Sequence, residues 1–396
     1  MKIMSVNAGS SSLKFKLFEM PEEKVITEGN VERIGLEDAY FTIKINGVKR
    51  KEVLPIKDHA VAVTKLLDEL ISNKVVESLD EIVGVGHRVV QGGWYFNDSA
   101  LVDDSVIAKI DELCSMAPLH NAAHLIGIRA FMKVLPNVPN VVVFDTAFHQ
   151  TMAPEAYMYA IPYEWYTKYK MRKYGAHGTS HQYVAARCAE LMGKDIKNLN
   201  IITCHIGNGA SLSAVKGGKC IDTSMGLTPL EGVPMGTRSG NIDPTVLSYI
   251  QSKEGTSLPD LIQILNKKSG YLGVSGVSND SRDLEEAFSK GNERAGLALD
   301  IQYKRVADYI ASYYCYLGGA DAIVFTAGIG ENSSRFRSQV IKRIAVLGAK
   351  INDERNKVRG QEKLISTDDS KIAIYLIPTD EELVIARDVM RIGKIK

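Results

Sequence analysis

Cysteine is scarce in this sequence and follows no metal or disulfide pattern. The chain has 396 residues but five cysteines, without a Cys-x-x-Cys pair: Cys114, Cys188, Cys204, Cys220 and Cys315. Such scattered thiols are typical of small buried side chains in a reducing compartment and argue against a disulfide framework or a zinc site. Long uncharged apolar runs and an N-terminal secretion signal are absent as well. We therefore expect a cytoplasmic protein that is not bound to a membrane.

The sequence also lacks an excess of charge. Its 48 Lys and Arg residues against 47 Asp and Glu residues leave a formal net charge of +1. This balance argues against nucleic acid or an anionic membrane as a partner. The basic run Lys49-Arg50-Lys51 follows Asn46-Gly47, a hairpin turn signal, and so predicts a solvated hairpin rather than a binding patch.

Two common nucleotide motifs are missing. The sequence has no Gly-x-x-x-x-Gly-Lys-Ser/Thr, and Gly328-x-Gly330 lacks the third glycine of a dinucleotide-binding turn. Instead, residues 3–14 and 202–213 share one plan, in which an apolar run, a Gly/Ser/Asn turn and an alternating run follow one another. Such turns aim several backbone N–H groups at one point, which suits a phosphate. We interpret them as parts of a duplicated fold that holds a nucleotide triphosphate between two lobes.

Strand-like and helix-like segments alternate along the chain, which is typical of an α/β protein. The length indicates more than one domain, and we expect a first lobe over residues 1–150 and a second over 151–381. Three local features are also expected: Ser180 caps a helix over His181–Met192, Thr326–Asn332 forms a loop, and Thr379–Glu382 begins the last helix with a capping box.

Five side chains are candidates for chemistry. Arg88 and Arg238 lie among glycines, where a guanidinium suits phosphate or carboxylate oxygens, although a single arginine more often forms a surface ion pair. His177 either donates to a phosphoryl oxygen or bonds to backbone. Asp145 follows a strand, where α/β folds place reactive carboxylates, or it caps the next turn. Glu381 is either a metal-linked carboxylate or an acid favoured by a helix N-terminus.

Eight segments carry a resemblance to a known family. They are Asn7–Lys14, Gly86–Val90, Pro118–Asn121, Phe144–His149, His177–His181, His205–Gly209, Met235–Gly240 and Phe325–Asn332. In these segments, and over essentially its whole length, the sequence resembles the acetate kinase (acetokinase) family of the actin/Hsp70/sugar-kinase superfamily.

The resemblance implies a fold and an activity. The fold has two lobes with duplicated ribonuclease H-like cores, each a mixed sheet flanked by helices, and a C-terminal helix over 382–396 that joins the first lobe. The activity is the reversible phosphorylation of acetate by ATP to give acetyl phosphate and ADP. The resemblance further implies a homodimer and Mg²⁺ as the cofactor, with Mn²⁺ as a substitute.

The resemblance also assigns roles to single residues. Asn7 and Glu381 match the metal positions, Arg88 the arginine that binds the substrate carboxylate, His177 and Arg238 the groups that stabilise the transition state, and Asp145 the acid/base. The nucleotide contacts match Lys14, His205, Ile206, Gly207, Asn208, Gly209, Asp280, Ser281, Arg282, Gly328, Ile329, Gly330, Glu331 and Asn332. The pocket for the acyl tail matches Val90, Leu119, Ala176 and Pro229.

Physical chemistry questions the role of Asp145. A carboxylic acid with a pKa near ~4–5, by analogy with Asp and Glu side chains, arrives ionised and needs no general base. We therefore expect Asp145 to orient an arginine or a metal-bound water more than it moves protons. Two alternatives to acetate phosphorylation stay open: a propionate or butyrate kinase with the same chemistry, and a module like actin or Hsp70 that hydrolyses ATP slowly.

Acyl selectivity gives a first testable prediction. Ala176 stands where many family members carry phenylalanine before the histidine, and each extra buried CH₂ contributes about 0.8 kcal/mol. We expect measurable turnover of propionate, with acetate still the default substrate. The measurement is kcat/KM for the two acids. Undetectable turnover of propionate would mean that another side chain fills the space, an equally open outcome on the sequence alone.

Overall fold

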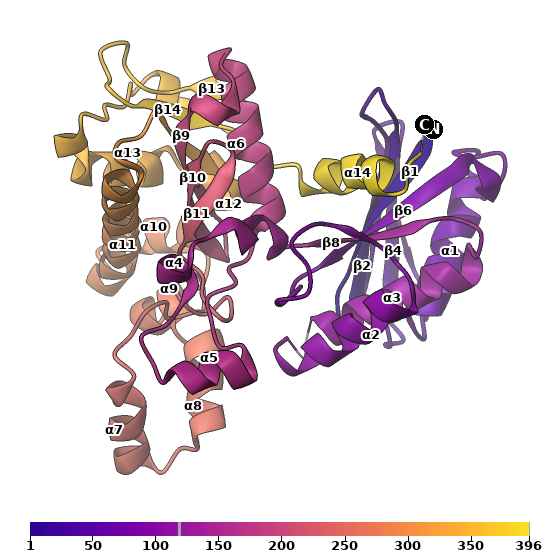
Figure 1. Ribbon diagram of the computed structural model, residues 1–396, viewed down its shortest axis with the longest axis horizontal. Coiled ribbons are helices and arrows are strands. Elements are labelled where there is room, and N and C mark those ends of the chain that lie inside the picture. The colour runs from indigo at the N-terminus through magenta and orange to yellow at the C-terminus, as the bar shows by residue number, and fades with distance from the viewer. Residues whose placement is uncertain (118–119, 396) are drawn as a thin grey trace. The chain divides into compact units, whose positions relative to one another are not determined.

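The computed structural model describes residues 1–117 and 120–395. The chain divides into two compact units (Figure 1): the first consists of Met1–Phe148 and Asp380–Lys396, and the second of His149–Thr379. The predicted lobes, residues 1–150 and 151–381, stay a prediction. None of the helices built from the described residues is long and apolar enough to cross a membrane.

The first unit is built on one mixed sheet with the strand order β5-β4-β3-β2-β1-β6-β8-β7. Its strands are β1 Lys2–Ala8, β2 Ser12–Glu19, β3 Lys24–Glu32, β4 Tyr40–Ile45, β5 Val48–Val53, β6 Ile82–Val89, β7 Ala100–Leu101 and β8 Asn140–Phe144. Strands β1, β6 and β8 run parallel, whereas β1, β2 and β3 pair antiparallel. The predicted hairpin around Asn46-Gly47 is confirmed by β4 and β5, and every residue of β5 is exposed.

Helices α1, α2, α3 and α14 surround this sheet, with the bounds α1 His59–Ser72, α2 Asp104–Glu112, α3 Asn121–Val134 and α14 Glu381–Ile392. Helix α3 contacts β1, β6 and α1, and α14, yellow in Figure 1, contacts β1, β6 and β8. Helix α14 approaches β6 closely at Gly84 and Gly86, because a Cβ on Gly86 would lie 2.7 Å from a methyl group of Val389. The C-terminal segment is therefore part of the first unit's core.

The second unit repeats the same sheet topology. Its order is β11-β10-β9-β12-β14-β13, and its strands are β9 Asn200–Ile206, β10 Ala210–Lys216, β11 Lys219–Thr223, β12 Ala322–Thr326, β13 Lys363–Leu364 and β14 Ala373–Leu376. In both units three antiparallel strands are followed by two parallel ones, in the order 3-2-1-4-5. The predicted α/β fold with duplicated cores is confirmed.

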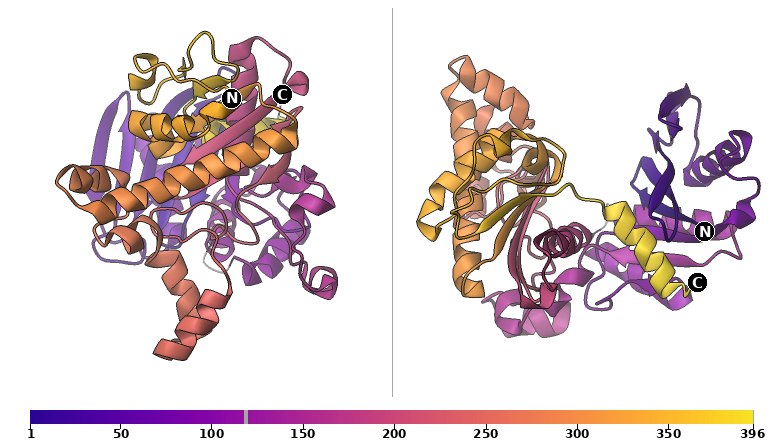
Figure 2. Two further views of the ribbon diagram at one scale, coloured as in Figure 1. Left: turned by 90° about the vertical axis from the view of Figure 1, so that its left-hand side faces the viewer. Right: turned by 90° about the horizontal axis from the view of Figure 1, so that it is seen from above.

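The helices of the second unit include one long element that covers the sheet. They are α4 Pro154–Tyr157, α5 Tyr163–Tyr169, α6 Gly178–Met192, α7 Thr245–Glu254, α8 Leu258–Lys267, α9 Gly270–Ser275, α10 Ser281–Ser289, α11 Glu293–Leu317, α12 Ala327–Asn332 and α13 Ser334–Arg343. Helix α11 contacts β9 and β10 and crosses the sheet in Figure 2. Its buried residues Leu299, Val306 and Ile310 recur at the helical period, which explains why this face joins the core.

Three local predictions need correction. Helix α6 begins at Gly178 with His177 as its N-cap, so Ser180 lies inside the helix, fully buried. The segment expected as a loop, Thr326–Asn332, contains the short helix α12. The last helix is capped by Asp380 and not by Thr379, because the Asp380 carboxylate accepts from the Leu383 N–H at 3.1 Å. At the last helix a neighbouring carboxylate thus makes the bond that the motif was expected to make, whereas His177 makes no side-chain cap bond to α6.

Arg337 on α13 joins the end of α12 to the loop near residue 356, although no sequence motif indicated this role. Its side chain is fully buried, and all five N–H groups are bonded: Nη1 to the Gly330 and Glu331 carbonyls, Nη2 to the Asn356 and Val358 carbonyls, and Nε to the Asn356 side chain, at 2.6–3.0 Å. Burial, with a smaller effect of Arg359, lowers the pKa of Arg337 to about 10. Arg337 therefore fixes the end of α12 against the loop near residue 356.

We predict that Arg337→Lys destabilises the protein strongly. Lysine has three donors and no planar fork, so buried carbonyls lose their partners at about 1–3 kcal/mol each. Urea unfolding should show a loss of at least about 3 kcal/mol. The matched control is Arg335→Lys on the same helix, where the side chain is exposed and a change within about 0.5 kcal/mol is expected. Equal midpoints for the two variants would contradict the assignment.

Candidate functional site

Three parallel strands of the first unit end at one edge of the sheet and carry predicted residues there. Asn7 is the next-to-last residue of β1, Arg88 the next-to-last of β6, and Asp145 directly follows β8. The carboxyl ends of parallel strands are where α/β folds bind ligands. Lys14 on β2 pairs in register with Asn7 across the hairpin. The structure thus brings four predicted residues to one edge.

Arg88 and Asp145 form a forked ion pair at this edge. Arg88 Nε donates to Asp145 Oδ1 at 3.0 Å, and Nη2 donates to Oδ2 at 2.6 Å. The Glu381 carboxylate, at the start of α14, lies 3.9 Å from Nε. Burial alone would lower the pKa of Arg88, but Asp145 and then Glu381 outweigh it, so that pKa is raised above its usual value. Asp145, 1% exposed, is committed to Arg88, which supports an orienting role.

Two buried histidines hold the first glycine turn, and sequence reasoning missed both. His59 Nε2 donates to the Gly9 carbonyl at 2.8 Å, and His124 Nδ1 donates to the Ala8 carbonyl at 2.7 Å. Burial, followed by the positive charge of Arg88, lowers the pKa of His124 to about 4, so this ring stays neutral near pH 7. Both histidines lie on helices, α1 and α3, and nothing in their local sequence indicates contact with β1.

The corresponding turn of the second unit brings the other predicted residues together. The Gly207 N–H donates to the Gly209 carbonyl at 2.9 Å, and the Asn208 carbonyl accepts from the Gly236 N–H at 3.1 Å. The second bond holds the loop that carries Arg238 against the turn. A Cβ on Gly209 would lie 3.5 Å from both Arg238 Nη1 and His177 Nε2. The tips of the two side chains therefore converge at Gly209.

The cation at this turn, Arg238, has no carboxylate partner within the residues that the structure describes. Arg238 Nη1 donates to the Pro229 carbonyl at 3.3 Å, and no carboxylate of the described residues forms an ion pair with Arg238. Burial lowers its pKa below the usual value. A partly buried guanidinium without a carboxylate is costly unless an anion binds it. The arrangement is therefore suited to an anionic ligand.

His177 is held from two sides. Its backbone has φ +61°, in the left-handed region, and its Nδ1 lies 2.9 Å from Ser211 Oγ. Its ring stacks on His205, with 4.0 Å between the centroids and 20° between the planes. His205 Nδ1 in turn lies 2.7 Å from Ser180 Oγ. The ring of His177 thus has a fixed orientation, with Nε2 directed to the Gly209 turn.

The remaining nucleotide positions lie at two helix starts of the second unit. Asp280 caps α10, and its carboxylate accepts from the N–H and the side chain of Arg282. The segment Gly328–Asn332 forms most of α12, directly after β12. Glu331 Oε1 accepts from the Ala327 N–H at 2.8 Å and from the Thr379 N–H at 3.2 Å, so its carboxylate is engaged by backbone. Glu331 is thus suited to shaping the segment.

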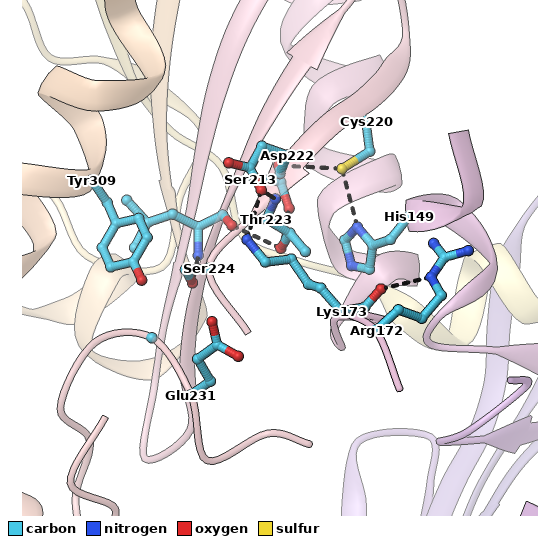
Figure 3. Close-up of polar contacts among 12 residues, drawn as sticks. His149, Arg172, Lys173, Ser213, Cys220, Asp222, Thr223, Ser224, Glu231 and Tyr309 are labelled. Atoms are coloured by element: carbon cyan, nitrogen blue, oxygen red, sulfur yellow. Dashed lines mark hydrogen bonds and ion pairs between the residues drawn. The ribbon is translucent and has the colours of Figure 1, made fainter. Parts of the chain in front are cut away.

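The acyl-pocket positions are divided between the units. Val90 is half-buried in the first unit, Ala176 and Pro229 belong to the second, and Leu119 lies outside the described residues. The Ala176 carbonyl accepts from His149 Nε2 at 3.0 Å. His149 Nδ1 contacts Cys220 Sγ at 3.2 Å, as Figure 3 shows. This pocket stays a prediction, as do the roles of the other site residues.

Comparison with known proteins decides the family. A sequence model of the acetokinase family matches residues 2–387. The chain belongs to the acetokinase family. It is similar to the acetate kinase of Chlorante-Aster yellows phytoplasma, with 59% identity over 392 residues, which cover 99% of this chain and 95% of that protein.

Solved acetokinase structures share the fold along the whole chain. The crystal structure of Porphyromonas gingivalis acetate kinase superposes with a TM-score of 0.95 and 45% identity, covering 99% of both chains. A propionate kinase from Francisella tularensis subsp. tularensis SCHU S4 gives a TM-score of 0.93 and 42% identity over 98% of this chain and 99% of the other. Both match far more closely than a shared fold requires.

We predict that Asp145→Asn weakens acetate binding. The amide loses the charge and one of the acceptors that hold Arg88, and hydrogen bonds to charged groups contribute about 1.5–3 kcal/mol, which corresponds to roughly ten- to a hundredfold. We expect KM for acetate to rise at least about tenfold, with KM for ATP nearly unchanged. The control Asp98→Asn removes an acid from an exposed fork with Arg391 and should leave both constants unchanged. Near-normal turnover of Asp145→Asn would contradict any important role for its charge.

Proposed function

We propose that this chain transfers the terminal phosphoryl group of ATP directly to the carboxylate of acetate, reversibly, to give acetyl phosphate and ADP. The family supplies the reaction class. The observation that carries the assignment to residues is the convergence of Arg238 and His177 at the Gly209 turn, with no carboxylate among the described residues to neutralise Arg238.

The difficulty of this reaction is electrostatic. Acetate arrives ionised at neutral pH, and the phosphoryl group it attacks is anionic too, so the two reactants repel each other. Negative charge is then spread over the three equatorial oxygens of an in-line transition state. Cations and N–H donors at those oxygens lower the barrier, whereas a general base adds little. This chemistry fits a site rich in arginine and histidine.

In the proposal Arg88 binds the acetate carboxylate. Asp145 occupies Nε and Nη2 of its guanidinium, which leaves the Nη1 edge for a second carboxylate. Asp145 holds the fork in place and does not transfer a proton. Arg238 and His177 donate to the phosphoryl oxygens.

The nucleotide and a magnesium ion complete the proposed site. Asn7 and Glu381 offer an amide and a carboxylate oxygen, the hard ligands that Mg²⁺ accepts together with waters and phosphates. Among the described residues, no group of three or more His, Cys, Asp or Glu side chains is arranged to hold a metal ion. When bound, Mg²⁺ neutralises phosphate charge. Lys14, residues 205–209, 280–282 and 328–332 are proposed to contact ATP.

Two wider properties complete the proposal. The family resemblance favours a cytoplasmic homodimer. Propionate is the second candidate substrate, because Ala176 is small and a propionate kinase is among the similar structures.

The proposed activity is tested by trapping the product. Purified protein is incubated with ATP, Mg²⁺ and hydroxylamine, and acid-dependent hydroxamate and ADP are measured for acetate, propionate and butyrate. We expect acetate to give the most product. Arg238→Ala should lower kcat by roughly 10³-fold or more, whereas Arg305→Ala, an exposed arginine on α11, should not. ADP release that is independent of added acid would instead indicate idle ATP hydrolysis.

A further inference from the structure

A series of three buried polar side chains leads to His177. Thr203 Oγ1 on β9 lies 2.7 Å from His181 Nδ1 on α6. His181 Nε2 lies 2.8 Å from Ser211 Oγ on β10, and Ser211 Oγ lies 2.9 Å from His177 Nδ1. Thr203, His181 and Ser211 are all 0% exposed. Bulk water therefore does not reach Thr203, His181 or Ser211.

The hydroxyl of Ser211 couples the proton positions of His177 and His181. The Ser211 hydroxyl carries one proton, and within the described part of the chain the two rings are its hydrogen-bond partners, so it donates to one ring and accepts from the other. A neutral imidazole carries its proton on one nitrogen only. Once the proton of His181 is placed, the position of the His177 proton follows. The two rings consequently share the same tautomer.

The hydroxyl of Thr203 sets the direction in which these hydrogen bonds are donated. Besides His181, an acceptor for its hydroxyl is the Ser213 carbonyl at 3.4 Å, beyond the usual 2.5–3.0 Å of an O–H···O bond. The 2.7 Å contact to His181 Nδ1 is the well-formed one. Thr203 therefore donates to His181, His181 Nε2–H donates to Ser211, and Ser211 donates to His177 Nδ1. Burial, and then the charges of His149 and His205, lower the pKa of His181 well below its usual value, so this ring stays neutral.

We propose that Thr203, His181 and Ser211 are positioning residues that hold His177 as the neutral tautomer with its proton on Nε2. Nε2 is the nitrogen that faces the Gly209 turn beside Arg238. With the opposite tautomer, a neutral His177 would present a lone pair to an anion and repel it. The catalytic meaning rests on the proposed phosphoryl transfer, whereas the tautomer is a property of the resting protein and is measured without substrate.

The first test is ¹⁵N NMR of the full chain labelled at histidine, with the His177 signal assigned from the spectrum of His177→Gln. We expect an unprotonated Nδ1 and a protonated Nε2 near pH 7.5. A His177 with its proton on Nδ1 would overturn the proposal, whatever reaction the protein catalyses. Absence of acyl phosphate formation would overturn the proposed function and leave this result standing.

The second test compares two serines on one strand. Ser211 and Ser213 are both fully buried on β10, but Ser213 Oγ bonds to Thr223, as Figure 3 shows, and not to a histidine. Removing a transition-state donor outright costs about 10²–10³ in kcat, so Ser211→Ala should lower kcat at least about tenfold. KM for both substrates should stay within about twofold, and the His177 signal should shift toward mixed tautomers. Ser213→Ala should change neither quantity.

A pair at Thr203 covers the case in which Ser211→Ala fails to fold. Thr203→Ser keeps the hydroxyl and should retain the parent tautomer and kcat. Thr203→Val keeps the shape but removes the donor, so the His177 signal should move toward Nδ1 protonation and kcat should fall several-fold. Equal spectra and rates for the two variants would contradict the direction that we assign.

Discussion

One electrostatic constraint governs this chain: two anions must come together at a single phosphorus atom. Repulsion between like charges grows as water is excluded, because the effective dielectric falls. Positive groups must therefore be present before the reactants arrive, and each needs a fixed direction. The chain holds such groups at the carboxyl ends of parallel strands in the first unit and at the Gly209 turn in the second.

Three arginines show three ways in which the structure accommodates a positive charge. Arg88 is compensated by Asp145, which fixes its plane and leaves one edge available. Arg238 has no carboxylate partner among the described residues, so its charge is satisfied best when an anion binds. Arg337 bonds to backbone carbonyls and one amide with all five N–H groups and serves the fold alone. The hydrogen-bond partners of an arginine therefore distinguish a side chain suited to binding an anion from one that stabilises the fold.

The sequence predicts what depends on neighbouring residues and fails where distant ones decide. Strand ends are local, so the sheet and the placement of Arg88 and Asp145 at one edge follow from the pattern. The predicted cap of α6 was wrong because the Ser180 hydroxyl bonds to the side chains of His205 and Thr379, which are both distant in the sequence. Arg337 was missed because its acceptors come from two separate loops. Leu119 and the acyl pocket remain predictions.

The duplicated topology does not assign the histidine roles, which in particular escape the sequence. Both units place a glycine turn after the first strand of the 3-2-1-4-5 order. In the first unit, His59 and His124 donate to carbonyls of that turn and cannot also act on a ligand through the same nitrogen. In the second unit, hydroxyl groups lie against Nδ1 of His177 and His205, and Nε2 of His177 faces the Gly209 turn. These histidines come from different elements, α1 and α3 in the first unit and the start of α6 and strand β9 in the second, so the topology does not assign their roles, and the hydrogen-bond partner of each ring makes the difference.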